Sequence, residues 1–135
     1  MDFTGIESFI KEKSNGNNLE IMLVLKLLLE NDSLTENSIY KTITSFLNEH
    51  SDKLPNSYSK HFGSKRQFFL NNKVTASLSK LADNQIIRSS GNNRISYTLT
   101  CSLETSQKTE LLKLITIQTM FLLKIRIRRN WQNWA

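Results

Sequence analysis

The stretch that decides the fold runs from residue 72 to residue 100 and reads NKVTASLSKLADNQIIRSSGNNRISYTLT. Its first part places Val74, Leu78 and Leu81 at positions i, i+4 and i+7, which is the spacing of one apolar face of an α-helix. Asparagine at the start of the stretch can cap such a helix. We therefore predict a helix over about 72–83 that buries this apolar face.

The second part of the stretch has the period of a β-strand. Ile95, Tyr97 and Leu99 alternate with polar residues, as in a strand with one buried face. Residues 89–93 consist of serine, glycine and asparagine, which favour turns, and an apolar Ile-Ile pair lies shortly before them. The pattern predicts a β-hairpin with a polar tip.

Upstream of this stretch, apolar residues at helical spacing predict three more helices. One is a short amphipathic helix that begins near Thr4, the second covers residues 19–30, and the third covers about 34–49. The second is apolar on nearly every side, so we expect it at the centre of the core. A polar segment at about 50–70 holds the only proline and is expected to be a long inserted loop with a basic end.

The last part of the chain is again rich in apolar residues and predicts a helix from about Thr105 to Asn130. These residues cover most of the helical circumference, and a helix at the end of a small domain buries only one face. We therefore expect one domain over residues 1–103 and a dimerisation helix over residues 104–135. The residues expected in the dimer interface are Leu111, Leu114, Ile115, Ile117, Phe121, Leu122, Ile125 and Trp131.

The order of these elements resembles the winged helix-turn-helix proteins, in particular bacterial and archaeal transcriptional regulators of the MarR and PadR kind. The resemblance covers about residues 19–100. It is clearest over 81–87, where a leucine-bearing turn leads to an Ile-Ile strand, and over 97–100, which read Tyr-Thr-Leu-Thr. Asn84 stands where those families usually have glycine, and asparagine tolerates the left-handed backbone. The resemblance implies a mainly α-helical fold with a small β-hairpin wing and a long C-terminal dimerisation helix.

The positive charge is concentrated in the second part of the chain. The 135 residues carry 18 Lys and Arg against 12 Asp and Glu, a formal net charge of +6. Residues 1–59 have five basic and nine acidic side chains, whereas residues 60–94 have seven basic side chains against Asp83 alone. Such a segmental excess favours a polyanionic partner, and a solvated basic face is the alternative.

A recognition helix at 72–83 would face the major groove of duplex DNA, and a wing over 88–94 would lie on the backbone or in the minor groove. Short polar side chains reach base edges and lysines reach phosphates. In the alternative interpretation, the same serines and asparagines only cap the helix and face solvent. We expect Phe68 and Phe69 to anchor the loop on the core. The residues expected to contact DNA are Asn72, Lys73, Thr75, Ala76, Ser79, Lys80, Arg88, Asn92, Asn93, Arg94 and, from the loop, Lys65 and Arg66.

Cysteine and histidine are scarce. Cys101 is the single cysteine and cannot form an internal disulfide, which favours a reducing cytoplasm. One thiol with His50 and His61 cannot complete a structural zinc site. The sequence has no Gly-rich phosphate loop, nucleophile elbow or paired-histidine motif, so we expect no enzyme, no metal and no cofactor. It also has no secretion signal and no membrane-spanning run, so we expect no membrane partner.

These observations predict a cytoplasmic, homodimeric protein that binds double-stranded DNA sequence-specifically and regulates transcription. Three roles remain open for the basic C-terminus with its two tryptophans: dimer packing, which we favour, membrane-surface contact and DNA-backbone contact. The alternative function is a winged-helix protein-interaction subunit of a replication, partition or polymerase assembly, in which the C-terminal helix binds another protein.

Overall fold

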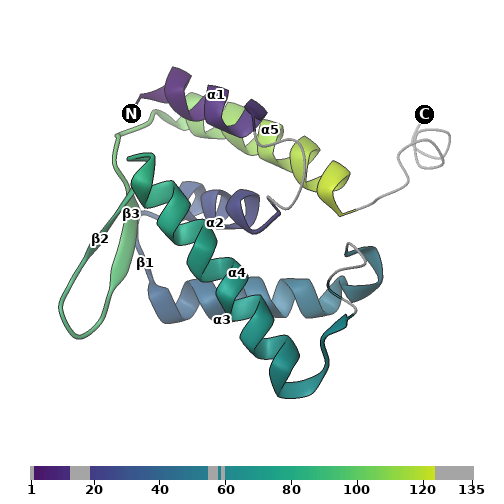
Figure 1. Cartoon of the computed structure of the whole chain (residues 1–135). Coiled ribbons are helices and arrows are strands. Elements are labelled where there is room, and N and C mark those ends of the chain that lie inside the picture. The colour runs from purple at the N-terminus through teal and green to yellow at the C-terminus, as the bar shows by residue number, and fades with distance from the viewer. Residues whose placement is uncertain (1, 13–18, 55–57, 59, 124–135) are drawn as a thin grey trace, which may run out of the picture.

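The computed structural model describes residues 2–12, 19–54, 58 and 60–123. Within these residues, five α-helices and a small three-stranded antiparallel sheet form the fold (Figure 1). The elements are, in chain order, α1 (Phe3–Glu12), α2 (Leu19–Glu30), β1 (Leu34–Thr35), α3 (Glu36–Glu49), the short 3-10 helix η1 (Ser51–Lys53), α4 (Gly63–Asp83), β2 (Ile87–Ser90), β3 (Ser96–Leu99) and α5 (Thr105–Leu122). The prediction of a mainly α-helical fold with a small β-hairpin is confirmed.

The sheet contains a strand that the sequence pattern does not predict. β2 and β3 form the expected hairpin, with Ile87 opposite Leu99. β1 pairs with the other edge of β3, with Leu34 opposite Tyr97, so the strand order is β1-β3-β2. Because β1 has only two residues, it is too short to show the alternation that identifies a strand. Its pairing joins the start of α3 to the hairpin.

α2 lies at the centre of the core, as its all-round apolar sequence predicts. Residues 19–25 are buried without a break, and α2 packs against α3, α4 and α5. α1 packs on α5, and these two helices cover one side of α2 while α3 and α4 cover the other (Figure 1). Every other helix therefore packs on α2 or on a helix that covers it.

α5 shares the core of the helices before it. Leu111 and Ile115 of α5 belong to the same buried apolar cluster as Ile6 and Ile10 of α1. The described part of α5 is therefore packed into the main core rather than standing apart as an arm. The C-terminal end of the predicted helix, residues 124–130, lies outside the described residues.

The turn between α4 and β2 differs in detail from the expectation. The left-handed residue is Gln85, with φ 61°, whereas Asn84 has φ −87°. The Thr100 hydroxyl donates a hydrogen bond to the Gln85 carbonyl at 2.6 Å, and the Ile86 N–H donates to the Leu81 carbonyl at 3.0 Å. These bonds on both sides of Gln85 hold the turn in place and offset the cost of its backbone conformation.

Candidate nucleic-acid interface

α4 begins at Gly63, well before the predicted start near Asn72. Phe62 has an extended backbone and Gly63 a positive φ of 59°, a conformation that glycine adopts at little cost. The next residues, Ser-Lys-Arg-Gln-Phe-Phe-Leu, include several good helix formers. The prediction of a loop at 50–70 is therefore wrong beyond Phe62. The predicted recognition helix at 72–83 is the C-terminal part of a longer helix.

One side of α4 carries a continuous series of exposed side chains, spaced three or four residues apart. We name it the α4 stripe, and it consists of Lys65, Phe68, Asn72, Thr75, Ala76 and Ser79. Lys80 is exposed next to it. The Thr75 hydroxyl also donates to the Asn71 carbonyl at 3.0 Å and hydrogen-bonds the hydroxyl of Tyr40, which ties α4 to α3. The structure thus brings six of the predicted DNA-contacting residues to one accessible surface: Lys65, Asn72, Thr75, Ala76, Ser79 and Lys80.

Lys73 has different surroundings from the residues of the α4 stripe. Its side chain is half-buried, and its ammonium nitrogen lies 5.3 Å from the centroid of the Tyr58 ring and 5.7 Å from that of the Phe69 ring. Both distances permit a cation–π attraction. Lys73 therefore stabilises the contact between α4 and the segment before it, and its predicted DNA contact stays a prediction.

The sequence predicts both Lys65 and Arg66 as phosphate contacts. In the structure, the two side chains have different surroundings. Arg66 is half-buried: its Nε donates to Asn48 Oδ1 at 3.1 Å and its Nη1 donates to the Tyr58 carbonyl at 3.0 Å. These bonds join α3, the segment before α4 and α4 itself. Lys65 is exposed. We therefore correct the prediction for Arg66, whose guanidinium is engaged in structural hydrogen bonds, and retain Lys65.

The β2–β3 hairpin presents exposed polar residues at and beside its turn. They are Arg88, Asn92, Asn93 and Arg94. Gly91 has φ 98°, and a Cβ there would lie 2.2 Å from the Arg94 carbonyl oxygen, so the turn requires glycine. The Tyr97 hydroxyl donates to Glu36 Oε2 at 3.1 Å, which fixes the hairpin to α3. Burial, with the hydrogen bond and charge of Glu36 and the neighbouring Tyr40, raises the pKa of Tyr97 to about 12.

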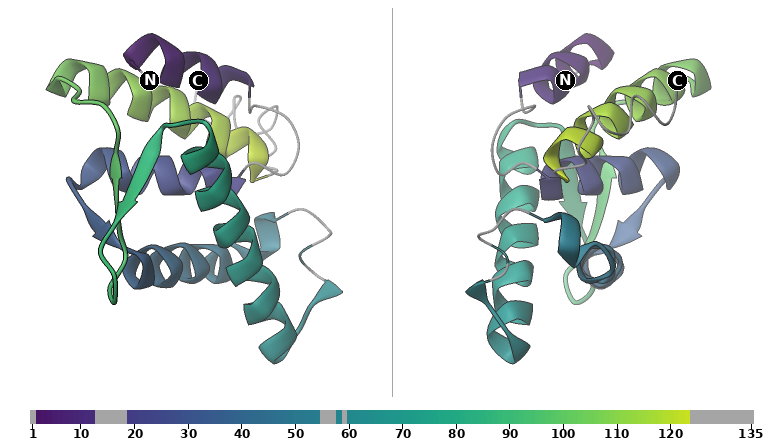
Figure 2. Two further views of the ribbon diagram at one scale, coloured as in Figure 1. Left: turned by 60° about the vertical axis from the view of Figure 1, so that its left-hand side comes forward. Right: turned by 90° about the vertical axis from the view of Figure 1, so that its right-hand side faces the viewer.

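α4 and the hairpin extend in the same general direction. The turn of the hairpin and the N-terminal end of α4 both point away from α1 and α5, towards opposite ends of α3 (Figures 1 and 2). Their exposed cations Lys65, Lys80, Arg88 and Arg94 have no ion-pair partner among the described residues, where the ion pairs lie within α1 and α2. Positive charge on these two elements is therefore not neutralised within this part of the chain.

The segment before α4 is anchored in the core by Tyr58. This residue is 2% exposed, and its hydroxyl donates a hydrogen bond to Glu20 of α2, which is 1% exposed. Burial, followed by the charge and hydrogen bond of Glu20, raises the pKa of Tyr58 well above its ordinary value. The Phe69 ring packs edge-on against Tyr58 with the centroids 5.4 Å apart, whereas Phe68 is 69% exposed. The predicted anchoring role is confirmed for Phe69 and wrong for Phe68.

Three of the residues predicted in a dimer interface lie in the core of the single chain. These are Leu111, Ile115 and Leu122, which are at most 8% exposed. They pack α5 against α1 and α2 and have almost no exposed area to offer a partner. The prediction is therefore corrected for these three side chains.

The accessible face of α5 contains two other predicted interface residues. Ile117 is 52% exposed and Leu114 is half-buried. The side chain of Phe121 and the whole of Ile125 and Trp131 lie outside the described part of the chain. The surface that α5 offers in the described structure is therefore centred on Leu114 and Ile117.

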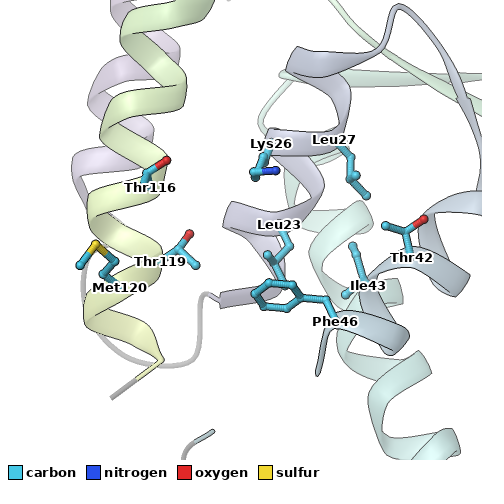
Figure 3. Close-up of a pocket in the computed structure, with 9 residues that line it drawn as sticks. All are labelled: Leu23, Lys26, Leu27, Thr42, Ile43, Phe46, Thr116, Thr119 and Met120. Atoms are coloured by element: carbon cyan, nitrogen blue, oxygen red, sulfur yellow. The ribbon is translucent and has the colours of Figure 1, made fainter. Parts of the chain in front are cut away.

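An apolar pocket of about 210 Å³ lies between α2, α3 and α5 (Figure 3). Its lining residues are Leu23, Lys26, Leu27, Thr42, Ile43, Phe46, Thr116, Thr119 and Met120. The hydroxyl oxygen of Thr119 is buried and has no hydrogen-bond partner within the described structure. This volume is below the usual size of small-molecule sites and suits a single apolar side chain.

Within the described residues, no three His, Cys, Asp or Glu side chains lie close enough together to hold a metal ion. None of the helices in this part of the chain is both long and apolar enough to cross a membrane. Comparisons with protein-family models, curated proteins and solved structures give no match for the chain.

Proposed function

We propose that the protein binds double-stranded DNA through α4 and the β2–β3 hairpin, with the architecture of a winged helix. The observation that carries the proposal is the unneutralised charge of four exposed cations on these two elements, Lys65, Lys80, Arg88 and Arg94. The order of α2, α3 and α4 followed by the β2–β3 hairpin supports the proposal, because this order is the basis of the resemblance to winged-helix proteins. Duplex DNA is a polyanion, and fixed cations bind it by displacing its counterions.

In this proposal the α4 stripe enters the major groove. Asn72 and Ser79 have short side chains with hydrogen-bonding groups that can read base edges, and asparagine pairs well with adenine. Ala76 lies between them on the stripe, and its small side chain permits close approach of the helix to the bases. Lys65 and Lys80 contact phosphates along the same groove.

The hairpin acts as the wing. Arg88 and Arg94 contact the neighbouring backbone or enter the minor groove, where arginine is attracted by the negative potential. Asn92 and Asn93 extend the contact at the turn. The connection of Tyr97 to Glu36 fixes the hairpin relative to α3, so the helix and the wing meet the DNA as one surface.

The homodimer is part of the proposal, with the face of α5 around Leu114 and Ile117 as the contact. A two-fold dimer repeats the recognition helix and reads two half-sites about one helical turn apart. This symmetry suits a transcriptional regulator that recognises a pseudo-palindromic site.

The proposal is tested by titrating the full chain against duplex DNA over a series of salt concentrations. We expect binding below about 0.1 M salt that weakens steeply as salt rises. The double variant Lys80→Ala, Arg94→Ala binds more weakly, and the slope of log K against log salt falls in magnitude by about 1.8, since each phosphate contact contributes about 0.9.

The matched control is Lys113→Ala, which removes a positive charge from an exposed position on α5. Its slope is expected to equal that of the unmodified protein. Absence of measurable binding below about 0.1 M salt contradicts the proposal, as does an equal slope in the double variant and the control. Selection of preferred sites from a random pool then tests sequence specificity.

A second candidate function is that of a protein-interaction subunit in a replication, partition or polymerase assembly. The apolar pocket between α2, α3 and α5, together with the exposed Ile117, favours this candidate, because both are suited to an apolar partner surface. Light scattering coupled to size exclusion distinguishes the two. A stable dimer that Ile117→Asp converts to a monomer supports the regulator, and a monomer supports the subunit.

A further inference from the structure

The N-terminal end of α4 carries an open groove of about 490 Å³. We name it the aromatic groove, and it is lined by His61, Ser64, Lys65, Phe68, Phe69 and Asn72. Lys65, Phe68 and Asn72 also belong to the α4 stripe. DNA that follows the stripe towards the start of α4 therefore reaches the groove.

One part of the groove is a fixed stack of rings. The His61 ring lies on Phe69 with the centroids 4.2 Å apart and the planes at 21°. Phe69 in turn packs on Tyr58, which Glu20 holds in the core. Because these rings are held by buried contacts, this part of the groove is preorganised and loses little conformational entropy when a ligand binds.

Two further rings are largely exposed to water. Phe62, just before α4, is 78% exposed, and Phe68, on the stripe, is 69% exposed. In the part of the chain that the structure describes, the exposed large apolar side chains are these two and Ile117. Such rings contribute little to the stability of the fold and are available to stack on a flat partner.

The lining of the groove includes Lys65 and no Asp or Glu. No Asp or Glu occurs between Asp52 and Asp83 in the sequence, whereas Lys60 and Lys65 are exposed on either side of Phe62. The surroundings therefore attract an anionic ligand and bring no carboxylate from this segment to repel it.

We propose that the aromatic groove binds an unpaired nucleobase, so that the protein prefers duplex DNA that is locally opened. The base packs flat on the ring of Phe68, which lines the groove, and the exposed ring of Phe62, next to His61 in the sequence, offers a second stacking surface. The Asn72 amide hydrogen-bonds the edge of the base, and Lys65 pairs with its phosphate. Stacking on aromatic rings accepts any base, because each base has a π-face. The inference rests on the DNA binding by α4 proposed above. It adds that the DNA recognised contains an unpaired base.

A nucleotide suits the groove better than an apolar peptide does. An apolar peptide would cover the rings but leave the lysines and the amide without partners. An unpaired nucleotide supplies a flat face, a hydrogen-bonding edge and a phosphate, which match the three kinds of group present. The groove is also continuous with the surface proposed to contact duplex DNA.

The test compares three labelled DNAs of one sequence: the paired duplex, the duplex with a central bubble of mismatched bases, and the single strand. The full chain is expected to bind the bubble duplex more tightly than the paired duplex. The double variant Phe62→Ala, Phe68→Ala lowers the affinity for the bubble duplex by about 5- to 150-fold, the range for losing the stacking of one base. It lowers the affinity for the paired duplex less, because paired bases cannot stack on these rings, so the preference for the bubble duplex is lost.

The control variant is Lys113→Ala on α5, which shortens an exposed side chain outside the groove and is expected to leave all three affinities unchanged. If the double variant keeps the preference for the bubble, the groove proposal is wrong and duplex binding by α4 stands. If the unmodified protein binds none of the three DNAs, both proposals fail. If the double variant only dissociates an oligomer, the rings cover a second copy of the chain, and base binding is overturned.

Discussion

The two halves of α4 are held in place in different ways. In the C-terminal half, residues 73–83, Val74, Leu78 and Leu81 are buried against the core. In the N-terminal half, residues 63–72, the buried side chain is Leu70, and further contacts join this half to Asn48 of α3 and to the segment that precedes the helix. Polar and aromatic contacts therefore extend this helix beyond the core. The extension leaves its remaining sides available to a ligand.

The largest expected difference between the two halves of α4 is the loss of stability when one side chain in each half is truncated. Leu81→Ala removes a fully buried side chain, so we expect the free energy of unfolding to fall by about 2–5 kcal/mol. Phe68→Ala removes an exposed ring and is expected to change it by less than about 0.5 kcal/mol. Urea denaturation followed by circular dichroism measures both. Equal losses would show that Phe68 packs in solution and would remove the distinction between the halves.

The support of the N-terminal half can be broken at Tyr58. Tyr58→Phe deletes the hydroxyl that donates to the buried carboxyl group of Glu20, and we expect a loss of about 2–3 kcal/mol in the free energy of unfolding. The double variant Tyr58→Phe, Glu20→Leu replaces both partners by apolar groups and should recover most of this loss. Glu20→Leu alone completes the cycle. If the losses of Tyr58→Phe and Glu20→Leu add in the double variant, the hydroxyl and the carboxyl group do not depend on each other.

The difference between the halves also explains how much of the fold the sequence predicts. The C-terminal half repeats apolar residues at i, i+4 and i+7, and that periodicity identifies it as a helix. The N-terminal half has one buried leucine, so periodicity does not distinguish it from a loop. The same limit applies to β1, whose two residues become a strand only through their pairing with β3.

The candidate site shows a similar division. The exposure of Asn72, Ala76 and Ser79 is predictable, because residues opposite a buried helical face are exposed. The roles of Lys73 and Arg66 cannot be predicted in this way, because their partners lie on other elements or in the segment before α4. Such long-range contacts leave no periodic signal in the sequence.

Lys65 and Arg66 are neighbours whose removal should affect different properties. Arg66→Ala deletes hydrogen bonds to Asn48 and to the Tyr58 carbonyl, so we expect a loss of about 1–2 kcal/mol in the free energy of unfolding. Lys65→Ala removes an exposed charge and should change stability by less than about 0.5 kcal/mol. It should weaken DNA binding and reduce the salt slope by about 0.9.

Urea denaturation measures the stability of Arg66→Ala and Lys65→Ala, and titration with DNA measures their affinity and salt slope. Lys113→Ala on α5 is the control for loss of a surface charge. A stable Arg66→Ala variant would show that its hydrogen bonds do not support the N-terminal half. A Lys65→Ala variant with an unchanged salt slope would remove Lys65 from the DNA contact.

The smallest expected effect is a loss of stability at alkaline pH. It compares Tyr97, which anchors the hairpin, with Tyr58, which supports the N-terminal half of α4. In the folded chain the pKa of Tyr97 is raised to about 12, above its unfolded value of about 10, so folding favours the neutral phenol. Its contribution to stability is therefore complete below about pH 10 and is lost as the pH rises to about 12. Tyr58 has the same sign, with a pKa raised further.

The free energy of unfolding, measured by urea denaturation at about pH 9, 10, 11 and 12, should therefore fall over the last three values. Tyr97→Phe has no phenol to ionise at this position, so its stability should fall less steeply over the same range. The remaining slope should shrink again when Tyr58→Phe is added, because the second raised pKa is then also removed. If Tyr97→Phe has the same slope as the unmodified chain, folding does not raise the pKa of Tyr97, and the burial of this phenol and its contact with Glu36 are not maintained in solution.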